Sequence, residues 1–143
     1  MFKEICIFIA NKIGLTIGTT LQAGHREQTA PDRCTLIAEA GGGETNYYCP
    51  DMANLNIQVL TRAKSYFQAR DDAWVAYEAL TNHGGTVPSA GWNMPNISSG
   101  PDYLAMVIEA ITTPQYIGQD TNGRYEFSTN YIFRMEEGSC VTP

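Results

Sequence analysis

The sequence is poor in histidine and in cations. Its 143 residues include two histidines, and nine Lys and Arg residues stand against fifteen Asp and Glu residues, which leaves a formal net charge of -6. Nucleic-acid affinity depends mainly on cations that release the counterions condensed on phosphates, so this balance argues against tight DNA or RNA binding. The same charge balance disfavours binding to an anionic membrane surface.

Long apolar runs are also missing. No run approaches the roughly 20 residues needed to span a bilayer, and the apolar stretch near the N-terminus is only about six residues long, with no cleavage site of small residues after it. We therefore expect a soluble protein without a signal peptide. The four cysteines, at positions 6, 34, 49 and 140, are then expected to be reduced thiols, because disulfides persist mainly in oxidising compartments.

Spacings typical of metal sites and of cysteine chemistry are absent. His25 and His83 have no second histidine three or four residues away, and there is no Cys-x-x-Cys pair. A thiol hydrolase that pairs Cys34 or Cys49 with one of the histidines stays open as an alternative, although nothing in the sequence places these groups together. We expect no catalytic residues, no metal and no cofactor.

What the sequence does contain is a set of amphipathic segments. Phe2, Ile5, Ile9 and Ile13 recur at near-helical spacing and Gly14 follows as a stop, which favours a helix over residues 2–13. The β-branched residues between positions 5 and 9 leave a strand open there. A second helix is expected after Ser65, with Ser65 and Gln68 forming a capping box.

The second helix has two distinct features. Its apolar stripe packs close to a sheet through three alanines, and the two glycines at 84 and 85 end it. The members of the stripe are Tyr66, Ala69, Ala73, Ala76, Tyr77 and Leu80. Phe67 and Trp74, seven positions apart, form a bulky edge that is either core or contact surface.

Four segments are expected to be strands. Residues 34–38 read as a strand that ends in a flexible turn at the glycines 41–43, and residues 55–61 alternate apolar and polar side chains. Residues 103–113 and 124–135 read as an antiparallel pair in which Asn122-Gly123 suits a hairpin turn with two positive φ angles. Pro114 cannot donate to a ladder, so the first strand of this pair should end or bulge near it.

These elements predict an α+β fold. We expect a single domain over residues 1–143, with a mainly antiparallel sheet packed by two helices. The dense Gly, Pro, Ser and Asn content at about residues 84–102 predicts a long irregular loop.

Two sets of residues are candidates for an interface with another protein. Trp92, Met94 and Ile97 are bulky apolar residues in the irregular loop, where they either form a contact surface or fold back on their own domain. The second set is aromatic and comes from the last strand: Tyr125, Phe127 and Tyr131. A sheet edge there offers unpaired backbone groups to a neighbouring subunit.

Three stretches together resemble one protein family. The first is Pro31-Asp32-Arg33-Cys34 leading through a strand to Gly41-Gly42-Gly43. The second is Gln58-Val59-Leu60-Thr61-Arg62 running into the helix of residues 66–80. The third is Ile117-Gly118-Gln119-Asp120 with Gly123-Arg124-Tyr125-Glu126-Phe127-Ser128 and Asn130-Tyr131. In this order, over roughly residues 21–134, they resemble the minor-capsid or tail-terminator proteins of long-tailed bacteriophages.

The resemblance implies a function. Such proteins are non-enzymatic virion subunits without a cofactor. They close into a homohexameric ring at the head-proximal end of the tail, stop polymerisation of the tail tube and join the tail to the head connector. The implied partners are other copies of the chain, the tail-tube protein and a head connector or head-completion protein. DNA passes through the ring without being bound specifically. The implied location is the head-tail junction of the virion, after assembly in the host cytoplasm.

Two other functions remain possible at this stage. Another head-tail joining subunit, such as a head-completion or connector protein, shares the size, fold class and ring habit. A small binding module of host type would instead be a stable monomer with a concave apolar pocket.

Overall fold

The computed structural model describes residues 1–26, 29–45, 52–82 and 91–137. These residues form a sheet of seven strands with two helices, which confirms the α+β class. The elements are α1 (Phe2–Ile13), β1 (Leu21–Ala23), β2 (Cys34–Thr45), β3 (Met52–Ala63), α2 (Tyr66–Leu80), β4 (Trp92–Met94), β5 (Tyr103–Ala110), β6 (Gln115–Gln119) and β7 (Tyr125–Glu137). No helix among the described residues is long and apolar enough to cross a membrane.

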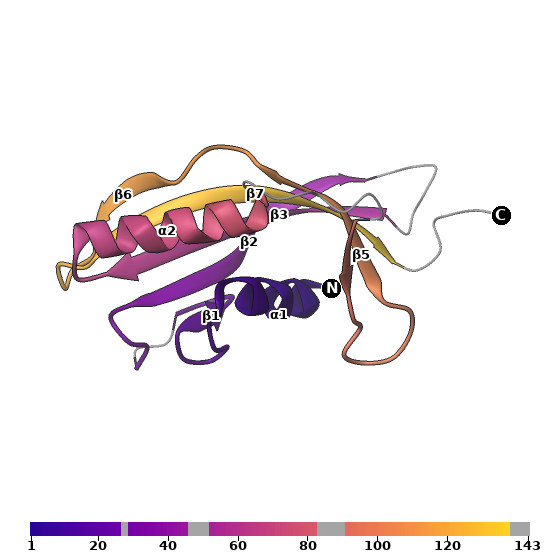
Figure 1. Ribbon diagram of the computed structural model, residues 1–143, viewed down its shortest axis with the longest axis horizontal. Coiled ribbons are helices and arrows are strands. Elements are labelled where there is room, and N and C mark those ends of the chain that lie inside the picture. The colour runs from indigo at the N-terminus through magenta and orange to yellow at the C-terminus, as the bar shows by residue number, and fades with distance from the viewer. Residues whose placement is uncertain (27–28, 46–51, 83–90, 138–143) are drawn as a thin grey trace.

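The sheet is long, curled and mainly antiparallel (Figure 1). Its order is β1-β2-β3-β7-β5-β4, and β6 pairs with β7 beside β5. Among the strand pairs of the described residues, the short β1–β2 pair alone is parallel. The β3–β7 pair forms the centre, with an unbroken register from Met52 opposite Glu136 to Ala63 opposite Tyr125. Residues directly opposite each other share a face of the sheet, so this register decides which side chains meet the helices.

Both helices cover the same face of the sheet. One buried cluster combines Ile5 and Ile9 of α1 with Leu80 of α2 and with Ile57 and Tyr131 of the central strands. Figure 1 shows α2 lying along the sheet and α1 beside it near β1. The two helices on one face bury the apolar side of the central strands, including Ile57 and Val59 of β3 and Tyr131 and Phe133 of β7.

The N-terminal segment is a helix, as its spacing indicates. α1 ends at Gly14, whose φ of 71° lies in the left-handed region and whose N–H bonds to the carbonyl of Ala10. Glycine reaches this conformation without steric cost, which explains the stop. The β-branched residues do not make a strand because the burial of Ile5 and Ile9 against the sheet outweighs their local preference.

The prediction that the strand beginning at Cys34 ends at the glycines is wrong. β2 continues to Thr45, and its pairing with β3 is irregular between Glu39 and Gly42 and again between Gly42 and Thr45. Gly41 has a φ of 89°, which suits a bulge. The glycines therefore bend the strand without ending it.

The second helix begins where expected, but not through a capping box. Ser65 is the N-cap residue with extended backbone, yet its side chain makes no capping hydrogen bond. The predicted stripe is buried at Ala69, Ala73, Ala76 and Leu80. Packing against β3 and β7 therefore stabilises the helix, and a side-chain cap does not. The helix ends at Leu80, and Gly84 and Gly85 lie outside the described residues.

The C-terminal strands pair antiparallel as expected, but the first strand ends at Ala110, and the hairpin turn joins β7 to β6, a strand that the sequence pattern did not predict. Pro114 separates β5 from β6, and both strands pair with β7 along the same side, so the predicted break at the proline is confirmed. The hairpin turn at residues 120–124 has one positive φ, at Gly123, and not two. The N–H of Gly123 donates to the carbonyl of Asp120 at 3.1 Å, which makes a turn followed by a single left-handed residue.

The expected irregular loop at about residues 84–102 is partly a strand. Trp92–Met94 forms β4 and pairs antiparallel with β5, with Trp92 opposite Ala105 and Met94 opposite Tyr103. The edge of β5 supplies the hydrogen-bond partners that the loop lacks by itself. Residues 83–90 of the loop lie outside the described residues.

Candidate interaction surfaces

The first predicted set of interface residues is divided between core and surface. Met94 is 1% exposed and belongs to the main core, whereas Ile97 is 45% exposed. Trp92 is half-buried, with its ring 5.8 Å from the ring of Phe8 on α1. The segment thus folds back on its own domain through Trp92 and Met94 and leaves Ile97 to solvent.

The second predicted set lies on β7, which is an interior strand. Phe127 is 3% exposed and Tyr131 is fully buried, while Tyr125 is half-buried. β7 pairs with β3 on one side and with β5 and β6 on the other. It therefore has no free edge for a neighbouring subunit along these pairings, and the buried side chains of Phe127 and Tyr131 offer no surface in this conformation.

An aromatic cluster joins the start of α2 to the β6–β7 hairpin. The ring of Tyr66 lies 5.4 Å from Tyr116, 5.7 Å from Tyr125 and 5.3 Å from Phe127. Phe67 stands edge-on to Tyr66 at 5.5 Å. These pairs have the tilted and T-shaped geometries that aromatic rings prefer. We call Phe67 and Tyr66 the Phe67 knob, because Phe67 is 72% exposed and Tyr66 supports it.

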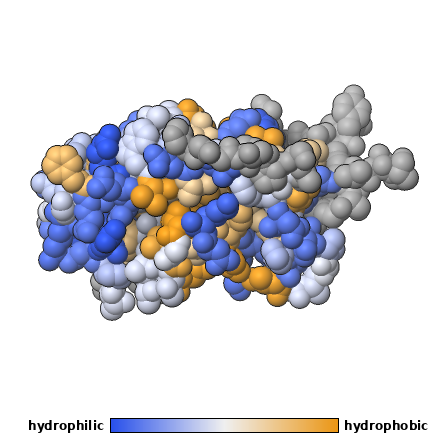
Figure 2. Space-filling model, viewed as in Figure 1, coloured by the Kyte–Doolittle hydropathy of each residue, from blue (hydrophilic) through white to orange (hydrophobic). Residues whose placement is uncertain are grey.

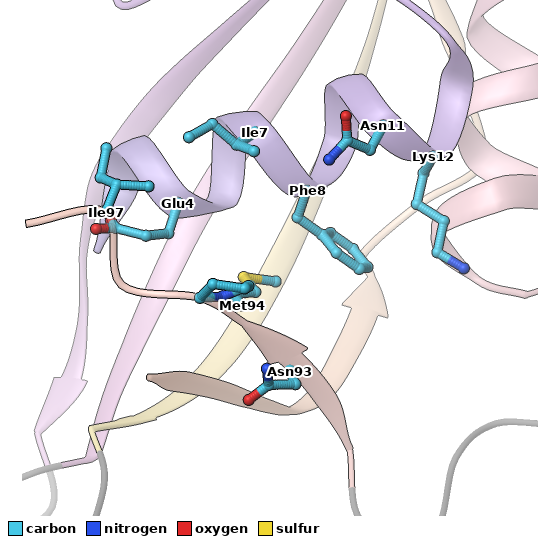
Figure 3. Close-up of a pocket in the computed structure, with 9 residues that line it drawn as sticks. Glu4, Ile7, Phe8, Asn11, Lys12, Asn93, Met94 and Ile97 are labelled. Atoms are coloured by element: carbon cyan, nitrogen blue, oxygen red, sulfur yellow. The ribbon is translucent and has the colours of Figure 1, made fainter. Parts of the chain in front are cut away.

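A pocket of about 390 Å³ lies between α1 and the chain around β4. Its apolar lining comes from Ile7 and Phe8 of α1 and from Met94, Pro95 and Ile97. Figure 3 shows Phe8 and Met94 at the space between the helix and the strand, with Lys12 at one end and Ile97 and Glu4 at the other. We call this the α1–β4 pocket.

Lys12 forms the polar end of the α1–β4 pocket. Its Nζ atom lies 4.1 Å from the centre of the Trp92 ring and 5.8 Å from that of Phe8, within range of cation–π attraction. At the other end, the side chain of Glu4 is 5% exposed, and its Oε2 atom forms an ion pair with the N-terminal amine at 2.8 Å. Burial opposes ionisation of Glu4, but the amine and the backbone hold the pKa of its carboxyl below the usual value.

The outer edge of the sheet beside β7 is rich in exposed apolar residues. Met106, Val107, Ile111, Tyr116 and Ile117 are 40–55% exposed. The register of this edge shifts between Ala105 and Val107 and between Tyr116 and Gly118. Such bulges, together with Pro114, interrupt the row of backbone groups that open-ended strand stacking would need.

The end of the sheet where β2 and β7 begin and β3 ends carries a network of ion pairs. The carboxylate of Asp32 forms ion pairs with Nζ of Lys64 at 3.1 Å and with Nη1 of Arg124 at 3.1 Å. Arg124 also donates to Asp120 at 2.7 Å, and Arg26 to Glu126 at 3.1 Å. The hydrogen bond from Lys64, together with Arg124, holds the pKa of Asp32 below its ordinary value. These cations are thus committed to carboxylates of the same chain.

Of the residues considered for catalysis, the structure describes Cys34 and His25. Cys34 is 4% exposed on β2, and His25 lies exposed after β1. Burial, with a contribution from Glu39, raises the pKa of the Cys6 thiol to about 11, so Cys6 stays protonated and weakly nucleophilic at neutral pH. His83 and Cys49 lie outside the described residues. Within those residues, no group of three or more His, Cys, Asp or Glu could hold a metal ion.

Sequence reasoning missed the α1–β4 pocket. Phe8 and Lys12 are four positions apart on α1 and therefore share a side of the helix, which was the available signal. Their meeting with Trp92 depends on how β4 joins the edge of β5, and no local pattern encodes that contact. Phe67 was recognised as bulky, but its exposure depends on which side of α2 faces the sheet.

Comparison with known families yields a match over most of the chain. Residues 8–137 match the family model described as bacteriophage tail terminator protein. No curated protein matches the sequence. The matched span begins in α1, ends with β7 and includes every strand.

Proposed function

Since this chain belongs to the bacteriophage tail terminator family and is thus a structural component of the phage tail, we propose that it forms a ring that ends tail-tube polymerisation. The ring sits at the head-proximal end of the tail and joins it to the head connector. The family membership confirms the resemblance drawn from the sequence motifs.

The family match is the observation that carries this proposal. It runs from Phe8 in the middle of α1 to the end of β7 and thus includes α2 and all the described strands. A ring needs two different patches on each subunit that fit each other with a rotation that closes. The described surface offers several exposed apolar patches, which supports repeated contacts between subunits.

The expected partners follow from the position of such a ring. Other copies of the chain, six in all, form the ring, the tail-tube protein meets one side of it, and a head connector or head-completion protein meets the other. Subunits made in the host cytoplasm become part of the virion at the head-tail junction. A net charge of -6 would keep phosphates from adhering as DNA passes through the ring.

The family match favours a tail terminator over another head-tail joining subunit. A thiol hydrolase receives no support from the described residues, because Cys6 and Cys34 are buried and the family is structural.

The proposal is tested in two steps. Native mass spectrometry and negative-stain images of the purified protein at micromolar concentration are expected to show a homohexameric ring. The ring added to tail-tube protein that is polymerising on a tail initiator is expected to limit tube length and to cap one end of each tube. Heat-denatured protein at the same concentration is the control, and it should leave tube growth unchanged.

Two results would contradict the proposal. One is a protein that stays monomeric even when tail tubes are present. The other is a ring that binds the head connector but leaves tube length unchanged, which would move the protein to the head side of the junction.

A further inference from the structure

Phe67 occupies a position where a polar residue is expected. It lies on the solvent side of α2 and is 72% exposed, beside the exposed Arg70 and Asp71. The helix buries its other side through small residues such as Ala69 and Ala73. Figure 2 shows that this end of the molecule, where α2 begins in Figure 1, is mainly hydrophilic. Phe67 is part of an exposed aromatic patch with Tyr66, which is 37% exposed, and Tyr116, which is 46% exposed, and such a patch in a mainly hydrophilic region indicates a contact with another molecule.

The Phe67 knob is held in place before any contact. Tyr66 packs edge-on against Phe67 and is itself wedged against Tyr116, Tyr125 and Phe127 of the hairpin. An aromatic side chain supported in this way loses little conformational entropy on binding. Aromatic residues of this kind supply much of the binding energy at protein interfaces.

The α1–β4 pocket is a suitable receptor for the knob. A cavity of roughly 150 Å³ accommodates benzene, so the pocket of about 390 Å³ has room for a phenyl ring and part of a second ring. The apolar side chains of Ile7, Phe8 and Ile97 would surround it. Charge also contributes. Of the two exposed charged residues one turn after Phe67, Arg70 lies over the Trp74 ring of its own helix at 5.3 Å, which leaves Asp71 to face the exposed Lys12 at the pocket.

The knob and the pocket lie apart on the molecule. Figure 1 places the start of α2 and the β6 hairpin at the left-hand end of the long axis, and α1 with β5 toward the centre and right. The knob therefore cannot fill the pocket of its own chain. Two different, complementary patches on one chain form a contact that repeats from copy to copy, and it closes into a ring when the rotation between neighbouring copies divides a full turn.

Resting on the ring of the proposed function, we propose that the Phe67 knob of each subunit inserts into the α1–β4 pocket of the next copy. The partner of this surface is a second copy of this chain. The contact is directional, since each subunit gives a knob on one side and receives one on the other.

Single variants test whether each half of the contact is needed. Phe67→Ser removes the knob, and Asn11→Trp fills the pocket from an exposed position in its lining. Each is expected to raise the protein concentration needed for half-maximal ring assembly at least tenfold in native mass spectrometry. Val75→Ser on α2 and Lys3→Trp on α1 are the controls, because both residues are exposed and lie outside the knob and the pocket. They should assemble like the wild type.

Mixing the two defective variants is the decisive experiment. The Asn11→Trp subunit keeps a knob and the Phe67→Ser subunit keeps a pocket, so a directional contact predicts a heterodimer with one copy of each and no ring. Circular dichroism of each variant checks that it is folded, and the heterodimer itself would show that both are.

The outcomes separate this inference from the proposed function. A wild type that forms no ring overturns both. A wild type that forms rings, with either variant assembling as well as the controls, overturns the knob-and-pocket contact alone. Variants that form rings but no longer cap tail tubes would show that the knob or the pocket binds the tail-tube protein. That result would also overturn the knob-and-pocket contact between subunits.

Discussion

Asp120 and Arg124 close the β6–β7 hairpin through three hydrogen bonds, one of which runs from the backbone N–H of Asp120 to the carbonyl of Arg124 at 2.9 Å. The Oδ1 atom of Asp120 accepts the backbone N–H of Arg124 at 2.9 Å, and its Oδ2 atom accepts Nε of Arg124 at 2.7 Å. The N–H of Asn122 donates to Oδ1 as well, at 2.9 Å. The hairpin turn is thus organised by one carboxylate.

The first prediction concerns this carboxylate. Asp120→Ala removes the acceptor of three hydrogen bonds and is expected to lower the free energy of unfolding by about 1–2 kcal/mol. Asp120→Asn keeps an oxygen that accepts from the two backbone N–H groups, so its free energy of unfolding should decrease clearly less than that of Asp120→Ala. Urea unfolding followed by circular dichroism measures both. Equal losses in the two variants would show that the turn does not depend on these backbone bonds.

The second prediction concerns acid stability. Lys64 and Arg124 lower the pKa of Asp32; at Asp120, burial acts in the opposite direction, but the hydrogen bonds from Arg124 and Asn122 outweigh it and lower the pKa. A carboxyl whose pKa is lower in the folded state stabilises the protein above its unfolded pKa, near 3.8, and this stabilisation is lost as the pH falls through the folded pKa.

The urea midpoint should therefore decrease between pH 5 and pH 2, and the Asp32→Asn/Asp120→Asn double variant should show a shallower decrease. Both proteins are measured at one ionic strength, because these ion pairs are partly exposed and screened by salt. Parallel pH profiles for the two proteins would contradict the assignment.

The third prediction concerns Gly91, which lies against the edge of β5. Its φ is 83°, and a Cβ atom there would lie 2.6 Å from the carbonyl oxygen of Ala105. Gly91→Ala is expected to lower the free energy of unfolding by about 2–4 kcal/mol, through the left-handed backbone and the clash together. Gly24 has the same φ of 83° with no atom within 4 Å of its Cβ position, so Gly24→Ala isolates the backbone cost. A similar loss in both variants would exclude the clash.

The fourth prediction separates core from surface phenylalanines. Phe133 is fully buried, and Phe133→Ala is expected to cost about 3–5 kcal/mol of folding free energy. Phe67→Ala, at a side chain that is 72% exposed, should change the stability of the monomer by less than about 0.5 kcal/mol. Unfolding is measured at protein concentrations below ring assembly. A large loss for Phe67→Ala under those conditions would show that its ring supports the fold.

The fifth prediction concerns the buried thiols. In a Cys49→Ser/Cys140→Ser variant, Cys6 and Cys34 should not react with an aromatic disulfide reagent until the protein is unfolded, because both are buried and burial raises the pKa of Cys6 to about 11. The same variant in denaturant supplies the full signal of two thiols. Fast labelling of one thiol in the native protein would revive the thiol-hydrolase alternative.

Local patterns in the sequence were sufficient for most of the secondary structure. The helical spacing of Phe2, Ile5 and Ile9, with a left-handed stop at Gly14, predicted α1 within its observed bounds. The alternation in residues 124–135 predicted β7, and Pro114 predicted the break before β6. These features depend on periodicity and on the backbone chemistry of single residues, which a sequence displays directly.

Long-range packing decided the rest. Tyr131, Phe127 and Phe67 are all aromatic, yet Tyr131 and Phe127 are buried and Phe67 is exposed. The β3–β7 register turns Tyr131 and Phe127 toward the helices, whereas Phe67 lies on the side of α2 that faces away from the sheet. β4 exists only because it pairs with β5. The sequence by itself determined the two helices and the long strands β3 and β7. The tertiary structure determined which apolar side chains remain for a partner, since that depends on contacts between residues far apart in the chain.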